Sequence, residues 1–168
     1  TYTYDGMGKL KTETANDGVV TYLEYDGFGN VKTKTDDYGT EGAENRTTEF
    51  VYNRLNRQWK ILAYDPNDTT EDVDIQITEY EYDFNGNVTK ITYPDKKSIE
   101  YIYNLFNKVD TEIQRDGTHI YYWYDQSRNL RYESDDPDGP NSTGVPGLLT
   151  EFRYDATGNL VYAWKGID

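Results

Sequence analysis

Hydrophobic and polar residues alternate along most of this chain. In residues 98–103, the large side chains of Ile99, Tyr101 and Tyr103 occupy every second position. Strict alternation is typical of a β-strand with one buried face. The pattern resumes after a short break, where it predicts Val109, Thr111 and Ile113 on one face of a second strand. We therefore expect two strands joined by a turn. The same alternation near the end of the chain places Leu160, Tyr162 and Trp164 on one face.

This two-strand pattern recurs seven times, and a fixed phrase marks each copy. The phrase is a tyrosine, an aspartate or asparagine, two or three variable residues, Gly-Asn or a relative of it, and then an aliphatic residue. The repeat tyrosines are 21, 27, 30, 21, 21 and 30 residues apart. Periods in this range indicate a repeat architecture. The residues assigned to this structural turn motif are Tyr4, Asp5, Gly8, Tyr25, Asp26, Gly29, Asn30, Tyr52, Asn53, Tyr82, Asp83, Gly86, Asn87, Tyr103, Asn104, Tyr124, Asp125, Asn129, Tyr154, Asp155, Gly158 and Asn159.

Each position of the phrase has a physical role in a hairpin turn. The Asp or Asn side chain accepts a hydrogen bond from a backbone N–H two residues on, which starts the turn. The glycine supplies a positive φ. Asn56, Asn107 and Arg128 hold the glycine position in three copies. Arginine tolerates the left-handed region poorly, so we expect a looser turn at residues 126–129.

The second strand of each unit ends in another tight turn. Asp17-Gly18 and Asp116-Gly117 are strong hairpin signals, and residues 94–97 serve the same purpose. The predicted fold is all-β, with about fourteen antiparallel strands in hairpin repeats that form a long, curved or spiralling ribbon. A β-propeller is the alternative, because two units approach the period of a four-stranded blade.

The alternation also assigns side chains to the two faces of this sheet. Two residues before each repeat tyrosine stands a large apolar residue: Tyr2, Leu23, Phe50, Tyr80, Tyr101, Tyr122 or Phe152. One face is therefore expected to carry an aromatic stripe. An acidic row is expected on the other face, formed by Glu49, Glu79, Glu100 and Glu151.

Composition supports a folded repeat despite its polarity. Only 35% of the residues are hydrophobic and the mean hydropathy is -0.96, which favours disorder. However, the chain has 18 tyrosines at fixed places, and tyrosine buries an apolar ring while its hydroxyl stays hydrogen-bonded. The net charge of -14 argues against nucleic acid and anionic membranes as partners. The sequence has no cysteine and no apolar stretch long enough to insert into a membrane.

Three units are longer than the rest, and their extra residues all fall at the Asp-Gly end. The insertions are 36–48, 64–77 and 134–149. Loops that vary at one edge of a repeat array form its binding face in many proteins, but tolerated drift in loop length explains them equally well.

The residues predict little catalytic chemistry. His119 is the single histidine, and it stands beside no nucleophile motif. No spacing singles out a carboxylate pair among the 31 acidic residues. We therefore expect neither an enzyme nor a cofactor.

Two binding functions deserve a test. Asp65, Asp68 and Asp72 are weak calcium candidates within one acidic insertion. Tyr121 and Trp123 alternate with the aromatic stripe and are expected to be exposed, with Trp59 as a further candidate. Exposed aromatic rings near carboxylates suit a cell-surface glycan.

The motif Y-D-x-x-G-N-[LV], with an aromatic residue two positions ahead, resembles the YD-repeat family, also called the RHS-repeat family. The full motif stands at Tyr25, Tyr82 and Tyr154, and the resemblance spans the chain. It implies a ribbon that spirals into a hollow shell within a large secreted or surface protein, such as a bacterial polymorphic toxin, an insecticidal toxin-complex component, a wall-associated protein or a teneurin. In the toxin relatives the shell encloses a C-terminal toxin, and some repeats have been proposed to bind carbohydrate. The family's self-cleavage segment is rich in DPxG, which occurs once here, at residues 136–139.

We therefore expect residues 1–168 to be a single array of seven repeats, cut from a longer repeat region. The predicted function is a non-catalytic scaffold segment of a secreted or cell-surface protein, with a carbohydrate-binding adhesion module as the alternative. The expected partners are neighbouring repeats, an enclosed toxin domain or a surface glycan. Unpaired sheet edges predict self-association of the segment.

Overall fold

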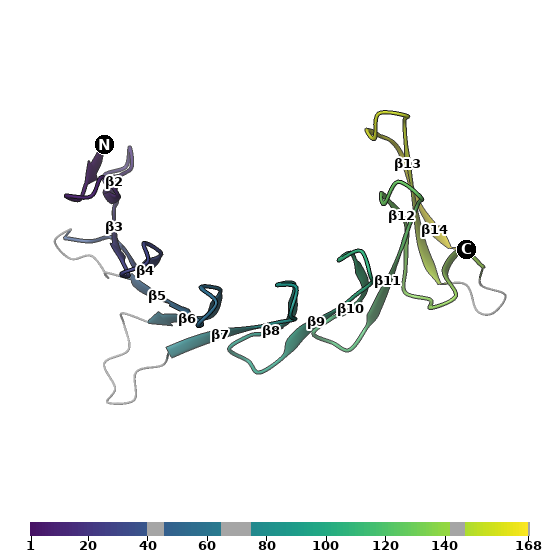
Figure 1. The fold of residues 1–168 in the computed structure, drawn as a ribbon, viewed down its shortest axis with the longest axis horizontal. Helices are drawn as coiled ribbons and strands as arrows, with labels where there is room; N and C mark the ends of the chain where they lie inside the picture. The colour runs from purple at the N-terminus through teal and green to yellow at the C-terminus, as the bar shows by residue number, and fades with distance from the viewer. Residues whose placement is uncertain (40–45, 65–74, 142–146, 168) are drawn as a thin grey trace. The chain divides into compact units, whose positions relative to one another are not determined.

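The computed structural model describes residues 1–39, 46–64, 75–141 and 147–167 (Figure 1). These residues form fourteen β-strands, and their single helical segment is a three-residue 3-10 turn, η1 (Gly139–Asn141). The strands are β1 (Tyr2–Tyr4), β2 (Leu10–Thr14), β3 (Val20–Tyr25), β4 (Val31–Asp36), β5 (Arg46–Tyr52), β6 (Gln58–Tyr64), β7 (Ile75–Tyr82), β8 (Val88–Thr92), β9 (Ser98–Tyr103), β10 (Val109–Ile113), β11 (His119–Tyr124), β12 (Leu130–Ser134), β13 (Leu148–Tyr154) and β14 (Leu160–Ile167).

The strands lie in one antiparallel sheet in the order of the sequence, from β1 to β14 (Figure 1). Consecutive strands are neighbours, so the connections are hairpins. The first and last strands are not neighbours in this order, and the sheet is therefore open. The prediction of an antiparallel hairpin ribbon is confirmed. The propeller alternative is wrong, because a propeller divides its strands among separate four-stranded blades.

By its internal contacts the chain divides into two compact units, Thr1–Tyr80 and Glu81–Asp168. Unit 1 contains β1 to β6 and most of β7. Unit 2 contains β8 to β14.

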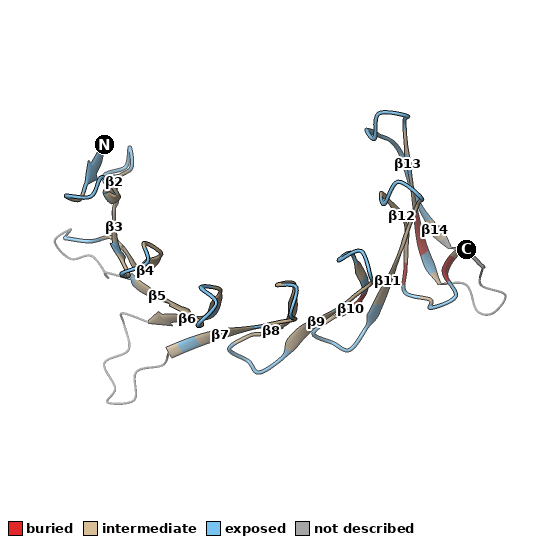
Figure 2. Cartoon of the chain, viewed as in Figure 1, coloured by how far each residue is buried: buried red, intermediate tan, exposed pale blue. Residues whose placement is uncertain are grey.

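Most side chains are only half-buried, because the sheet is a single layer with solvent on both sides (Figure 2). Leu149 is the one buried apolar side chain in the described part of the chain, at 6% exposure. The buried polar side chains, Thr111, Ser134 and Thr150, belong to the same unit 2. Without a second layer, cross-strand contacts contribute most of the stability.

The strand register confirms an aromatic stripe on one face, which we call the tyrosine face. In β9 and β10, Tyr103 lies opposite Val109. An aliphatic residue occupies this position in most copies, and Gln58 occupies it opposite Tyr52. The other pairs are Tyr4 with Leu10, Tyr25 with Val31, Tyr124 with Leu130, and Tyr154 with Leu160.

A β-bulge follows this pair in each YD hairpin whose register is described. In β10, Asp110 is the extra residue, so Thr111 pairs with Ile102 and Glu112 pairs with Tyr101. In a bulge, two residues of one strand lie opposite a single residue of the partner strand. Every later side chain of the bulged strand therefore lies on the opposite face from the one that simple alternation predicts. The expectation that Thr111 and Ile113 share the face of Val109 is therefore wrong. Residues on the tyrosine face just beyond the bulges are Glu13, Lys34, Ile61, Glu112, Glu133 and Ala163.

Four of the repeat tyrosines connect their hairpin to the one before it. The hydroxyl of Tyr103 donates a 2.7 Å hydrogen bond to the backbone carbonyl of Val88, the first residue of the preceding second strand. Burial raises the pKa of Tyr103, and the charge of Asp83 raises it further, so the phenol remains a donor. We call this contact the tyrosine link. The same link joins Tyr25 to Leu10 at 2.8 Å, Tyr52 to Val31 at 2.9 Å and Tyr124 to Val109 at 2.7 Å.

The tight turns at the opposite end also form as predicted. Gly18 and Gly117 have φ values of 88° and 87°. Lys96 takes the same conformation in the third turn, with φ 65°. Insertion residues 40–45, 65–74 and 142–146 lie outside the described residues.

The tyrosine link predicts that Tyr103→Phe destabilises the chain by about 1 kcal/mol, because a half-buried carbonyl loses its donor. Urea denaturation followed by circular dichroism measures the loss. Tyr101→Phe is the matched control, since the Tyr101 hydroxyl has no hydrogen bond to the described residues. Equal losses in the two variants would contradict the link.

Candidate functional site

The YD turn is the most regular polar arrangement in the structure. In the copy at Tyr25, Asp26 Oδ1 accepts hydrogen bonds from the backbone N–H groups of Phe28 and Asn30, both at 2.9 Å. The Asp26 N–H donates in turn to the Asn30 carbonyl at 2.9 Å. The sequence predicts the bond two residues on, and the structure adds a second bond four residues on. One side-chain oxygen thus closes the whole loop.

The asparagine of the Gly-Asn pair completes the turn, a role that the sequence analysis missed. Asn30 Nδ2 donates to Asp26 Oδ2 at 2.9 Å, so both carboxylate oxygens have partners. In two copies, Asn53 or Asn104 replaces the aspartate. In the same two copies, a basic residue replaces the asparagine that corresponds to Asn30. The side-chain pairing recurs between Asp83 and Asn87 at 2.8 Å, Asp125 and Asn129 at 3.3 Å, and Asp155 and Asn159 at 3.2 Å.

The turn at residues 126–129 is as tight as the others, so the prediction of a looser turn is wrong. Arg128 has φ 68°, and its N–H donates to the Asp125 carbonyl at 2.9 Å. Its guanidinium lies 4.6 Å over the ring of Phe106, in the preceding repeat. Stacking of this kind offsets part of the cost of the left-handed conformation.

Asparagines at the glycine position connect neighbouring turns. Asn30 Nδ2 donates to Asn56 Oδ1 at 2.6 Å in unit 1. In unit 2, Asn107 Oδ1 accepts from Asn85 at 3.0 Å and from Asn87 at 3.1 Å. Asn56 and Asn107 have positive φ values of 59° and 57°, as the sequence analysis predicts for this position. They therefore serve the turn through their backbone and the adjacent repeat through their side chain.

Hydrogen bonds keep the turn carboxylates ionised. The side-chain amide of Asn30 lowers the pKa of Asp26, and that of Asn87 lowers the pKa of Asp83. The Thr157 hydroxyl and the Asn159 backbone lower the pKa of Asp155 to about 2. Bonds that hold the charged form in this way leave the groups poorly suited to general acid or base catalysis.

The acidic row on the face opposite the tyrosines is matched by partners. Glu79 pairs with Lys60 at 2.8 Å, and Glu100 pairs with Lys90 at 2.7 Å. Glu151 accepts from Arg131 at 2.8 Å, and Glu49 accepts from the Tyr64 hydroxyl at 3.0 Å. The Lys90 ammonium lowers the pKa of Glu100 through its hydrogen bond and its charge. The row therefore resembles a set of cross-strand pairs more than a free acidic cluster.

Trp123 and Tyr121 are half-buried, which differs from the expectation that they are exposed. The 3-10 turn folds back on Trp123, and a Cβ at Gly139 would lie 2.4 Å from the indole ring. Tyr121 lies between His119 and Trp123, with ring centroids 6.1 and 6.3 Å away. Trp59 is 37% exposed, because it is the extra residue of the β6 bulge.

Two exposed aromatic residues stand on the same face in β14. Tyr162 and Trp164 are each 43% exposed. Trp164 lies opposite Glu151, and the Arg153 guanidinium lies 5.2 Å from the Tyr162 ring. The sequence places both aromatic residues on the face of Leu160, and the bulge after Leu160 reverses that assignment. These four side chains form an aromatic and charged group on one face of unit 2.

Four further features bear on function: the histidine, the calcium candidates, the DPxG segment and the capacity to span a membrane. His119 is exposed on β11, and the described residues contain no group of three acidic or histidine side chains that could hold a metal. The calcium candidates Asp65, Asp68 and Asp72 lie outside the described residues. Residues 136–139 form an ordinary turn, in which the Gly139 N–H donates to the Asp136 carbonyl at 3.0 Å. No helix in the described ranges is long and apolar enough to cross a membrane.

The pKa of Asp155 gives a pH prediction. The folded-state pKa of about 2 lies below the ordinary value of 3.8, so the ionised carboxylate stabilises its turn above pH 3.8. This stabilisation is lost as the pH falls from 3.8 toward 2. An NMR titration of the Asn159 amide should show a midpoint near the lower value, and Asp155→Asn should abolish the transition. A midpoint at 3.8 would contradict the hydrogen-bond network.

No protein-family model matches the sequence, and no curated protein matches it. Among solved structures, a chain of the Photorhabdus luminescens Tc holotoxin pore, in a form with a TccC3 mutation, is similar over 99% of this chain. The two share 19% identity and superpose with a TM-score of 0.68. A crystal structure of TcdB2-TccC3-Cdc42 also covers 99% of the chain at 23% identity, but its TM-score is 0.42.

The chain spans only 9% of the length of the Tc chain that it matches. At this identity, the likeness concerns the fold alone. The chain is thus similar in fold to a segment of a Tc holotoxin chain.

Proposed function

We propose that this chain is a non-catalytic scaffold, one segment of the wall of a large secreted or cell-surface protein of the toxin type. The observation that carries the proposal is the tyrosine link. In four copies the tyrosine that identifies the repeat also bonds to the preceding repeat, as the Tyr103 hydroxyl bonds to the Val88 carbonyl. Repeat arrays are stabilised by contacts of this nearest-neighbour kind.

The use of the other motif residues supports the same proposal. The aspartate, the Gly-Asn asparagine and the residue at the glycine position are engaged in closing turns or in joining them. Polar groups with these partners are poorly placed to act on a substrate. The resemblance to YD repeats and the fold likeness to a small part of a Tc holotoxin chain add a second line of support. Seven repeats in a single array, continued by further repeats of the parent protein, would form one stretch of such a wall.

The partners we propose follow from the same reasoning. Neighbouring repeats are the first partner, and a toxin domain enclosed by the wall is the second. The net charge of -14 disfavours nucleic acid and anionic membranes.

Two deletions in the full-length parent protein test the scaffold proposal. Removal of residues 83–103 takes out one complete 21-residue period, as measured between the repeat tyrosines, and should leave a folded parent protein. Removal of residues 88–97 takes out β8 and the following turn, which reverses the direction of every later strand relative to β1–β7 and moves the later YD turns to the opposite edge of the sheet. This deletion should abolish folding. Protease resistance of the purified protein is the readout.

The scaffold proposal would fail if the deletion of residues 83–103 abolished a chemical activity of the parent protein while protease resistance remained. That outcome would place the chemistry within this segment.

The exposed aromatic and charged group on β13 and β14 favours a second candidate, a glycan-binding module. Tyr162 and Trp164 are exposed, and the guanidinium of Arg153 and the carboxylate of Glu151 lie beside them. Flat rings next to polar groups suit the apolar and hydroxylated faces of a sugar.

If this candidate is correct, titration with a binding sugar should quench tryptophan fluorescence in a saturable way, and Trp164→Ala should weaken binding at least about tenfold. Trp123→Ala is the control, because the 3-10 turn covers Trp123. An absence of saturable quenching across a glycan array would leave only the scaffold.

A further inference from the structure

The tips of the YD turns in unit 1 carry large apolar side chains that contact little else. Met7, Phe28 and Leu55 are 79%, 88% and 70% exposed. The turn itself does not require them, because Ser127 and Thr157 stand at the position of Phe28 in other copies. Grouped exposed apolar side chains are characteristic of interaction sites.

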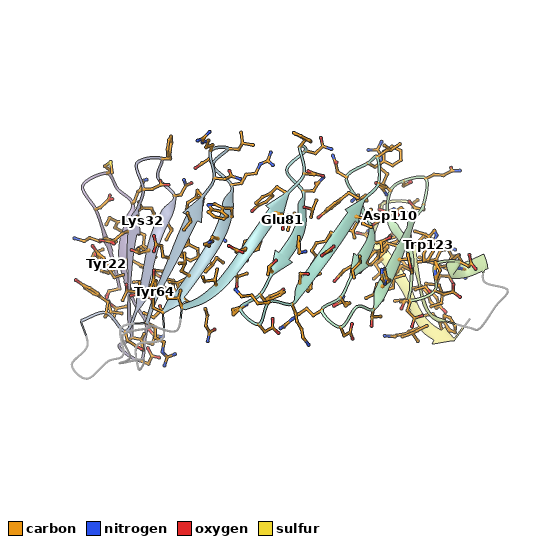
Figure 3. All side chains as sticks on the ribbon, turned by 90° about the horizontal axis from the view of Figure 1, so that it is seen from below. Tyr22, Lys32, Tyr64, Glu81, Asp110 and Trp123 are labelled. Atoms are coloured by element: carbon orange, nitrogen blue, oxygen red, sulfur yellow. The ribbon has the colours of Figure 1, made fainter. Side chains whose placement is uncertain are left out.

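A cavity of about 510 Å³ lies beside two of these tips, between the second and third YD turns. Phe28, Phe50 and Val51 contribute its apolar lining, and Lys32 and Arg54 contribute cations. In Figure 3, Lys32 lies toward the YD-turn end of unit 1, whereas Tyr64 lies toward the end with the insertions. The volume is within the usual range for ligand pockets.

The charged lining of this cavity comprises two carboxylates, Asp26 and Glu49, and two cations, and the cations alone have no partner among the described residues. Both carboxylates keep their charge, but they have hydrogen-bond donors: Asp26 accepts from Asn30, and Glu49 accepts from the Tyr64 hydroxyl. Lys32 and Arg54 are exposed and form no ion pair with any described residue. In a chain of net charge -14, two unpaired cations beside a bare phenyl ring favour an acidic group next to an aromatic one.

The other end of unit 1 presents such a group. Tyr38 follows Asp37 at the corner after β4, and it is 47% exposed. The Tyr38 N–H donates to the Val20 carbonyl at 2.9 Å, and its ring stacks on Tyr22 with centroids 4.5 Å apart. The corner is therefore held in place before any partner arrives. Asp37 forms no ion pair with the part of the chain that is described.

We propose that the cavity between the second and third YD turns is a docking site for the Asp37–Tyr38 corner of a second copy of this chain. The carboxylate would approach Lys32 and Arg54, and the phenol would pack against Phe28. The net charge of -14 on each chain opposes association in general, so a contact that pairs opposite charges is favoured over others. The inference concerns an interaction surface and does not depend on the proposed scaffold function.

The position of the two surfaces determines the kind of assembly. Lys32 lies near the start of β4 and Asp37 directly after its end, about 17 Å away for a strand of this length. One copy cannot fill its own cavity with its own corner, so the contact is head-to-tail. A contact of this type leaves a free surface at each end and adds further copies.

Analytical ultracentrifugation tests the proposal. The wild-type chain should form concentration-dependent oligomers that weaken as salt is raised, since the contact pairs opposite charges. A cavity variant, Phe28→Ser with Arg54→Glu, and a corner variant, Asp37→Lys with Tyr38→Ser, should each associate at least about tenfold more weakly. Circular dichroism and thermal unfolding establish that both variants remain folded.

A mixture of the two variants is the decisive measurement. The cavity variant keeps its corner and the corner variant keeps its cavity, so together they should form a 1:1 heterodimer and no larger species. A symmetric contact between tips would not be restored by mixing, and that result would overturn the proposal.

Phe84→Ser is the matched control, because Phe84 is a fully exposed residue at another YD turn and does not line the cavity. It should associate as the wild type does. Equal weakening by Phe84→Ser would indicate general stickiness of the tips and overturn the site. Oligomers that persist in both double variants would indicate pairing through the edge strands and would also overturn it.

Discussion

The structure depends on one type of hydrogen bond. In each linked repeat, the tyrosine hydroxyl donates to a backbone carbonyl of the hairpin before it. A single-layer sheet has no second layer against which to bury a core, and its side chains stay half-buried. The sheet therefore needs contacts directed along the array as well as across each strand pair. Tyrosine supplies both, because its ring covers the sheet face and its hydroxyl satisfies a carbonyl near the bulge. Phenylalanine would supply only the first.

The β-bulge next to each YD turn determines which other side chains lie on the tyrosine face. The bulge follows the pair of tyrosine and aliphatic residue, and it changes which side chains share the tyrosine face. This is why Glu112 lies beside Tyr101 and accepts a hydrogen bond from Tyr122 at 2.8 Å. Charged side chains thus interrupt the aromatic stripe. Because the sheet is a single layer, no large side chain in the described residues is fully buried.

The strands and turns could be predicted from sequence because they follow local rules of alternation and turn chemistry. The facing of the second strand could not be predicted from alternation within a single strand. Comparison of two consecutive hairpins does reveal the bulge. Ile113 pairs with His119, so the two side chains share a face. If alternation continued without an extra residue from Val109 to Ile113, Tyr124 would lie on the face opposite Val109. Exposure of Trp123 depends on how an insertion folds back, which no local pattern specifies. The second function of Asn56 and Asn107 depends on contacts with another repeat and was equally out of reach.

The asparagines that replace glycine give the array a fixed order. Asn56 bonds to Asn30 of the copy before it, and Asn107 bonds to Asn85 and Asn87 of its own predecessor. A copy that diverges from the consensus is therefore adapted to a particular neighbour. Exchanging two repeats would preserve every strand and turn yet break these pairings. The sequence differences among the seven copies therefore help to specify which repeats can be neighbours in the array.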